Sequence, residues 1–333
     1  MVNKLFLIFI LFFAACTTTP NFSNYENINS KDLPTQNITS NSNKEIMITP
    51  DKIHDVTTEK NLTRANINLS VQEVSGVSIA NWNLQIFGVS KASNLKLLNF
   101  YVDVIDEFDI IFIQEIRDKS QSSFEKLCDL LNDYNCKVSS RAGRSSSKEQ
   151  YGVIYKKSIL ITEFKDYNPD LSDRWERPPI KVTFDVDDYI FSVYNIHIKP
   201  DDVQNELYAL ESIVENTGNE LVLGDLNADC NYYNNDKENE FNSWYWILND
   251  NEDTTTSATD CAYDRIILNS DMNEEFNSYG IYSKNIVKEI SDHYLVWVQL
   301  GLNDFKPKIS EIKNPLETPE IEEIITQEEM IIE

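Results

Sequence analysis

Between residues 75 and 302, short apolar segments alternate with amphipathic ones, and most of the apolar segments stop at a polar side chain. The segment 77–84 alternates apolar and polar residues, which predicts a strand with one buried face, and the apolar segment 109–115 predicts a buried strand. Helices are expected over residues 92–108, 122–131 and 202–215. Further strands are expected near residue 137 and over residues 151–155, 181–184, 189–196, 220–225, 263–268 and 293–300. Helices interleaved with many strands, several of them antiparallel, predict a layered α/β (α+β) sandwich.

Several polar side chains stand where the predicted apolar strands stop. They are Asn83, Glu115, His197, Asp225, Asn227, Asp292 and His293. If the strands lie side by side, these residues meet at one rim, where carboxylate and amide oxygens suit a hard cation such as Mg²⁺. Two of the three histidines belong to this set, and histidine suits proton transfer near neutral pH. The pattern predicts a metal site with proton-transfer groups beside it.

The two ends of the chain differ from its middle. Lys4 precedes an apolar run over residues 5–15, which predicts an export signal over 1–15 that is too short to span a bilayer. The run ends in Phe-Ala-Ala-Cys16 and resembles a bacterial lipobox, so we expect Cys16 to be lipidated; ordinary signal cleavage is the alternative. Residues 16–74 are expected to form a flexible tether and residues 303–333 an acidic disordered tail. The protein is therefore expected outside the cytoplasm, anchored to the cell membrane or outer membrane.

Export changes how the remaining cysteines are interpreted, because disulfides form in oxidising compartments. If Cys16 carries a lipid, then Cys128, Cys136, Cys230 and Cys261 remain, and four cysteines can pair in three ways. There is no Cys-x-x-Cys pair and no cysteine–histidine cluster with zinc spacing.

Charge argues against one class of function. The chain has 55 acidic and 29 basic residues and a formal net charge of −26, most of it between residues 75 and 302. A negatively charged surface repels phosphates, so non-specific, electrostatically driven binding to nucleic acid is not expected. Hydrophobic residues make up 41% of the chain, which argues against global disorder.

Six short motifs occur in a fixed order along the chain. They are Asn81-Trp-Asn83, Gln114-Glu115-Ile-Arg117, Asn195-Ile-His197, Gly224-Asp225-Leu-Asn227-Ala-Asp229-Cys230, Cys261-Ala-Tyr263-Asp264-Arg265 and Ser291-Asp292-His293. Over about residues 77–300 they resemble the endonuclease/exonuclease/phosphatase superfamily, and most closely its pancreatic-type deoxyribonuclease I branch. The resemblance implies a four-layer sandwich of two packed mixed β-sheets flanked by helices, with the active site at one rim. It also implies phosphodiester hydrolysis with Mg²⁺ (or Mn²⁺).

The resemblance assigns roles to the residues at the rim. It implies that Glu115 and Asp292 hold the metal, that Asn83 lines the site, and that Asp225 and Asn227 lie beside the scissile phosphate. His293 with Asp264, and His197 with Glu149, are implied to transfer protons to and from water and the leaving 3′ oxygen. Which histidine is the base and which the acid stays open.

Other roles follow from the same resemblance. Arg117, Arg177 and Tyr263 match DNA-contacting positions, with a surface ion pair as the alternative for the two arginines. A structural Ca²⁺ loop is implied at Asp253, Thr255, Ser257 and Thr259. Cys230 and Cys261 match a structural disulfide, which leaves Cys128 and Cys136 for a possible second bridge. Ser147 stands where the pancreatic enzyme has a groove-binding tyrosine, so weaker groove binding is expected.

Together these features predict an exported, membrane-anchored, monomeric endonuclease that uses a divalent metal to cut DNA into 5′-phosphate products. Alternatives are a sphingomyelinase-type phospholipid phosphodiesterase or a genotoxic nuclease subunit of the same superfamily, or a non-catalytic surface lipoprotein. Because the protein is acidic, DNA binding is expected to depend on divalent ions more than on sequence.

Overall fold

The computed structural model describes residues 76–234, 237–301, 312 and 314–316. The predicted signal, the tether, Cys16 and most of the acidic tail lie outside these residues. Within the described part of the chain, no helix is long and apolar enough to cross a membrane.

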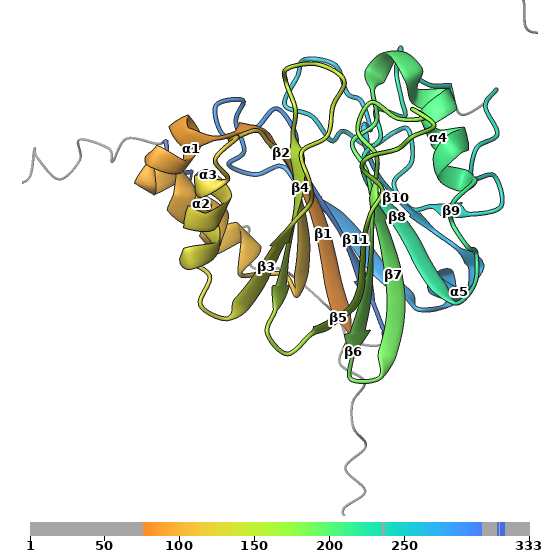
Figure 1. The fold of residues 1–333 in the computed structure, drawn as a ribbon, viewed down its shortest axis with the longest axis horizontal. Helices are drawn as coiled ribbons and strands as arrows, with labels where there is room; N and C mark the ends of the chain where they lie inside the picture. Colours follow the sequence, from red (N-terminus) through yellow and green to blue (C-terminus); the bar gives the residue numbers. More distant parts are fainter. Residues whose placement is uncertain (1–75, 235–236, 302–311, 313, 317–333) are drawn as a thin grey trace, which may run out of the picture. The chain divides into compact units, whose positions relative to one another are not determined.

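Two six-stranded mixed sheets form the centre of the described fold (Figure 1). The first has the order β11-β12-β1-β2-β4-β3, and the second has the order β5-β6-β7-β8-β10-β9. The strands of the first sheet are β1 (Val77–Phe87), β2 (Ile110–Ile116), β3 (Tyr134–Val138), β4 (Gln150–Lys156), β11 (Phe276–Tyr282) and β12 (Leu295–Leu300). The strands of the second are β5 (Leu160–Asp166), β6 (Ile180–Val186), β7 (Tyr189–Asn195), β8 (Asn219–Asp225), β9 (Tyr245–Trp246) and β10 (Asp264–Leu268). The pairs β1–β2 and β7–β8 are parallel, and the other pairs are antiparallel.

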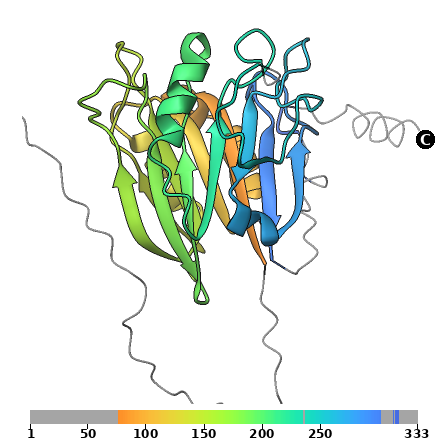
Figure 2. The same cartoon turned by 90° about the vertical axis from the view of Figure 1, so that its right-hand side faces the viewer.

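Helices cover the outer faces of both sheets (Figure 1), and Figure 2 views the molecule from the side of the second sheet. The helices are α1 (Val89–Ser93), α2 (Leu95–Ile105), α3 (Ser122–Asp129), the 3₁₀ helix η1 (Pro200–Asp202), α4 (Val203–Glu211) and α5 (Ser270–Glu274). α2 and α3 pack on the first sheet, and α4 packs on the second. The four-layer sandwich implied by the motifs is therefore confirmed.

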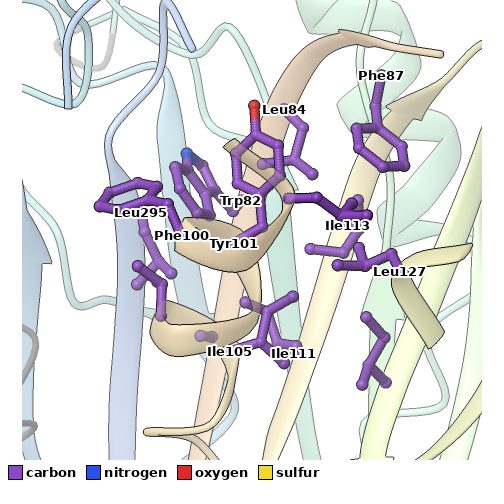
Figure 3. Packing of buried hydrophobic residues seen from close by; sticks show 14 of the residues in the cluster. Trp82, Leu84, Phe87, Phe100, Tyr101, Ile105, Ile111, Ile113, Leu127 and Leu295 are labelled. Carbon is purple, nitrogen blue, oxygen red and sulfur yellow. The ribbon is translucent and has the colours of Figure 1, made fainter. Parts of the chain in front are cut away.

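Three hydrophobic clusters separate the four layers. Along β1, Val77 and Ile79 belong to the cluster between the sheets, whereas Ala80 and Trp82 belong to the cluster under α2 and α3. Figure 3 shows the cluster under α2 and α3, in which the Trp82 ring meets the Tyr101 ring edge-on at 5.3 Å between centroids. Both faces of β1 are buried, so the strand with one buried face expected over 77–84 is wrong. Its polar residues Ser78, Asn81 and Asn83 are buried because their side chains are hydrogen-bonded within the protein.

The helix expected over 92–108 is two helices. Asn94 separates α1 from α2, and its side chain accepts a hydrogen bond from the N–H of Leu97, which caps α2. β5, β9 and β11 were not expected from the sequence. They lie at the edges of the sheets, where one side has no strand neighbour and few side chains are buried, so their apolar pattern is weak.

The sheet order brings the predicted site residues to one rim. β1, β2, β7 and β8 end there, whereas β10 and β12 begin there, at the upper end of the sheets in Figure 1.

Candidate active site

Asp225 lies at the centre of the rim, at the last position of β8. Its Oδ2 lies 3.3 Å from His197 Nε2 and 3.5 Å from His293 Nε2, and it accepts a 3.1 Å hydrogen bond from Asn83 Nδ2. Only 2% of Asp225 is exposed. The structure therefore brings together side chains from β1, β8 and two loops around one buried carboxylate oxygen.

His293 is paired with a buried carboxylate on the second sheet. Its Nδ1 lies 2.7 Å from Asp264 Oδ2, at the first position of β10, and Asp264 is fully buried. The loop before β12 holds the backbone of His293, because Ser291 Oγ accepts its N–H and Trp82 Nε1 donates to its carbonyl oxygen. With Nδ1 fixed by Asp264, Nε2 is the nitrogen that faces Asp225.

His197 has a similar pair on the other side of Asp225. Its Nδ1 lies 3.0 Å from Glu149 Oε1, at the end of the loop that precedes β4. Unlike Asp264, Glu149 is also in contact with two guanidinium groups: Arg177 Nε lies 2.7 Å from Oε1, and Arg117 Nε lies 3.5 Å from Oε2.

These surroundings shift the pKa values of both pairs. Burial opposes ionisation of Glu149, but His197, Arg177 and Arg117 outweigh it and lower its pKa to about 2. Burial and Arg177 disfavour protonation of His197, yet Glu149 and Asp225 raise its pKa above the ordinary value. For His293, Asp264 and Asp225 outweigh burial and raise the pKa. Both imidazoles therefore retain protons more strongly than a free histidine does.

The three residues predicted to bind the metal are found at the same rim. Asn83 Nδ2 lies 3.4 Å from Glu115 Oε1, and the N–H of Ile86 donates to Glu115 Oε2 at 2.8 Å. Asp292 Oδ1 lies 3.8 Å from His293 Nε2. This buried Asp292 oxygen accepts no hydrogen bond from any residue that the structure describes. A carboxylate oxygen left without a donor suits a cation ligand.

A second grouping of possible metal ligands lies close by. One ligand atom each of Glu115, Glu149 and His197 lies within 4.8 Å of the others. Glu149, however, is already compensated by two arginines and His197, and a hard cation prefers oxygen to imidazole nitrogen. Glu115 is common to this grouping and to the metal ligands predicted from the sequence.

A polar network beneath the rim was not assigned a role from the sequence. Asn195 Nδ2 donates to Asn81 Oδ1 at 2.9 Å, and Gln114 Nε2 donates to the carbonyl oxygen of Ile196 at 2.8 Å. Gln114 Oε1 accepts the N–H of Asp225 at 2.9 Å. All three amides are fully buried and join the two sheets directly behind the site. Their signal in the sequence is a polar residue one or two positions before a site residue in an apolar strand.

The predicted DNA-contacting residues have unequal access to solvent. Arg117 is 28% exposed and forms an ion pair with Glu115 at 3.0 Å. Arg177 is only 13% exposed, and its guanidinium is turned toward Glu149. Tyr263 is half-buried, and its ring lies 5.4 Å from that of Tyr232. Asn227 Nδ2 donates to the carbonyl oxygen of Ile198, which fixes its side chain beside Asp225.

The predicted calcium loop brings its oxygens together. Thr255 Oγ1 lies 3.4 Å from Asp253 Oδ1, 2.8 Å from Ser257 Oγ and 3.4 Å from the carbonyl oxygen of Thr259. The loop is also bonded to the His293 segment, since the N–H of Thr256 donates to the carbonyl oxygen of Asp292. The oxygen cluster suits a hard cation and lies next to His293.

Two disulfides are present. Cys230 is bonded to Cys261, which ties the loop after β8 to the segment before β10, as the resemblance implied. Cys128 is bonded to Cys136 and joins the end of α3 to β3, so the second bridge, left open from the sequence, is also formed.

Comparisons with known proteins agree with this geometry. Residues 80–293 match the Endonuclease/Exonuclease/phosphatase family. Deoxyribonuclease-1 of Homo sapiens is 31% identical over 268 residues, covering 69% of this chain and 94% of the relative. Deoxyribonuclease-1 of Gallus gallus is 30% identical over 269 residues, covering 70% of this chain and 95% of the relative.

Solved structures share the fold. Humanized D. rerio TDP2 superposes with a TM-score of 0.52 at 12% identity, covering 68% of this chain and 99% of that one. Mannosyl-6-phosphatase of Bacteroides thetaiotaomicron gives a TM-score of 0.51 at 17% identity, covering 68% of this chain and 100% of that one. With its sandwich, its paired histidines and a family match across most of the described residues, the chain belongs to the endonuclease/exonuclease/phosphatase family.

Proposed function

We propose that the protein is a divalent-metal-dependent endonuclease that hydrolyses DNA to 5′-phosphate products. The observation that carries this proposal is the pair of imidazoles, His197 and His293, whose Nε2 atoms both approach Asp225 Oδ2. The likeness to deoxyribonuclease-1 over nearly the whole length of that relative supports DNA as the substrate.

Glu115 and Asp292 would hold the metal, because they offer carboxylate oxygens at the rim and Asp292 Oδ1 has no donor among the described residues. When bound, Mg²⁺ (or Mn²⁺) would neutralise negative charge on the phosphodiester. The oxygens of the loop from Asp253 to Thr259 would take a structural Ca²⁺. These cations would offset part of the acidic field that repels DNA.

The two histidines would move the protons. In each, a carboxylate holds Nδ1 and leaves Nε2 to exchange a proton on the substrate side. One Nε2 would accept a proton from the attacking water, and the other would give a proton to the leaving 3′ oxygen. Asp225 and Asn227, fixed between them, would lie beside the scissile phosphate.

Substrate choice tests the proposal. The full chain is incubated with supercoiled plasmid, with sphingomyelin and with a sugar phosphate, each with Mg²⁺ and Ca²⁺. We expect nicked plasmid whose nicks DNA ligase can seal, because sealing requires a 5′-phosphate next to a 3′-hydroxyl. Cleavage of sphingomyelin without any nicking of plasmid would favour the phospholipid phosphodiesterase instead.

We also propose that Cys16 carries a lipid that anchors the protein to a membrane outside the cytoplasm. The apolar run that ends at Cys16 supports this. In detergent phase partitioning, the wild type should enter the detergent phase and Cys16→Ser should not. Partitioning of Cys16→Ser into detergent would contradict the anchor.

A further inference from the structure

The backbone of His197 is held from behind by an arginine that the sequence assigned to DNA. Arg177 Nε donates to the carbonyl oxygen of His197 at 2.9 Å, and Arg177 Nη2 donates to that of Ile198 at 3.1 Å. The same guanidinium contacts Glu149 Oε1 at 2.7 Å. Arg177 therefore joins the imidazole's carboxylate partner to the imidazole's own backbone.

A fully buried carboxylate on α4 holds the two segments that carry these residues. Glu206 Oε1 accepts the N–H of Glu176 at 2.7 Å, and Oε2 accepts the N–H of Lys199 at 3.2 Å. Glu176 precedes Arg177, and Lys199 follows His197 by two residues. Trp175 Nε1 also donates to the backbone oxygen of Glu206 at 3.0 Å, so α4 is bonded to the Arg177 segment twice.

Arg177 is committed mainly to groups of the protein itself. Its side chain is 13% exposed, and its partners are Glu149 and the carbonyl oxygens of His197 and Ile198. Glu149 is also paired with Arg117 and His197, so Arg177 is one of three groups that compensate this buried carboxylate. Removing Arg177 would therefore disturb both the charge on Glu149 and the backbone that carries His197.

We propose that Arg177 and Glu206 are positioning residues that hold His197 and Glu149 in the geometry for proton transfer. This inference rests on the proposed nuclease function for its kinetic effect, but the bonds that carry it do not depend on the substrate. It also explains why a carboxylate with no contact to the rim is buried in α4.

The two roles of Arg177 predict different kinetics. A phosphate contact supplies charge, so Arg177→Lys should keep much of the activity, and Arg177→Ala should reduce the slope of log(kcat/KM) against log[salt] by about 0.9. A positioning residue supplies a planar set of donors that lysine cannot reproduce. In that case Arg177→Lys lowers kcat by about 100-fold with little change in KM.

Glu206→Gln separates the roles further, because Glu206 lies behind the site and cannot touch a phosphate. Glutamine keeps one acceptor oxygen and turns an amide N–H₂ toward a backbone N–H, so one of the two bonds is lost. We expect kcat to fall about tenfold with KM unchanged. Arg174→Lys is the matched control: Arg174 lies three residues from Arg177, but its guanidinium pairs with Asp170 and stacks on the Trp175 ring, and the kcat of the variant should be that of the wild type.

The experiment measures plasmid nicking by the full chain for these variants, together with hydrogen–deuterium exchange of residues 195–199. We expect the backbone amide of Lys199 to exchange faster in Glu206→Gln than in the wild type. In Arg177→Lys, the amides of Ile198 and Lys199 should both exchange faster. Both results are expected whether or not DNA is the substrate. Wild-type kcat in both Arg177→Lys and Glu206→Gln, or unchanged exchange in both, would overturn the positioning role. Failure of the wild type to cut DNA would overturn the nuclease function, and the exchange result would still decide the positioning role.

Discussion

The two histidine–carboxylate pairs lie on either side of Asp225, but their surroundings differ in charge. Among the ion pairs of the described residues, the His293–Asp264 pair has two further carboxylates beside its imidazole, Asp225 and Asp292. Glu149, which holds His197, is shared with Arg117 and Arg177. With both imidazoles protonated, the first pair and these carboxylates carry excess negative charge, whereas the second pair and its two arginines carry excess positive charge.

This difference teaches that the two imidazoles are not interchangeable. Arg177 opposes protonation of His197, whereas Asp225 and Asp292 favour protonation of His293. A cation held by Glu115 and Asp292 would act on both imidazoles, since Asp292 Oδ1 lies 3.8 Å from His293 Nε2 and ligand atoms of Glu115 and His197 lie within 4.8 Å of each other. The difference between the two imidazoles therefore comes from Arg177, which opposes protonation of His197 only.

The largest effects are expected from removing either imidazole. His197→Ala and His293→Ala should each lower kcat by about 10²- to 10⁴-fold, because each removes one proton-transfer group. The double variant should be little slower than the worse single variant, since the two groups serve one reaction. Rates that multiply in the double variant, measured by plasmid nicking, would show that the two pairs act independently.

Replacing the carboxylates tests the difference in charge through stability. Glu149→Gln leaves Arg117 and Arg177 without their buried partner and should lower the free energy of unfolding by about 3 kcal/mol. Asp264→Asn leaves only an imidazole, which unlike a guanidinium can release its proton, and should cost about 1 kcal/mol. Urea unfolding of both variants gives these values. An equal or greater loss in Asp264→Asn would contradict the comparison.

Calcium should stabilise the His293 side selectively. The loop that carries Asp253 and Thr255 is bonded to the segment from Asp292 to Tyr294. Saturation at 100 times the dissociation constant should raise the free energy of unfolding by about 2.7 kcal/mol in the wild type. Asp253→Asn should lose most of this gain, as measured by thermal unfolding with and without Ca²⁺. The idea fails if Asp253→Asn responds to Ca²⁺ as strongly as the wild type does.

The smallest effect is a pH dependence on the His197 side. Burial raises the pKa of Glu206 to about 7 from 4.5, although the N–H groups of Glu176 and Lys199 oppose the shift. The unfolded chain releases this proton at lower pH than the folded protein, so this contribution to stability is lost as pH rises from about 4.5 to 7. The loss should be measurable in the wild type and absent in Glu206→Gln. If the unfolding free energies of the wild type and Glu206→Gln change equally with pH, Glu206 does not contribute this pH dependence.

The sequence predicted the rim well because its residues stand at the ends of apolar strands within specific motifs, as Glu115, Asp225 and Asp292 do. It missed β5 and β11 because edge strands bury few side chains and so leave little apolar pattern. It could not place Arg177 behind His197, because that arrangement depends on residues from three distant segments meeting in space. Local pattern predicts strand ends, whereas the partners of a buried charge depend on tertiary packing.

The central claim is that one metal-dependent site with two histidine–carboxylate pairs hydrolyses DNA. The most direct test follows conversion of supercoiled plasmid to the nicked form by the full chain with Mg²⁺ and Ca²⁺, with and without EDTA, beside His197→Ala and His293→Ala. The account predicts nicking that EDTA abolishes and that both substitutions reduce at least about 100-fold. Nicking that persists in EDTA, or that both substitutions leave unchanged, would contradict it.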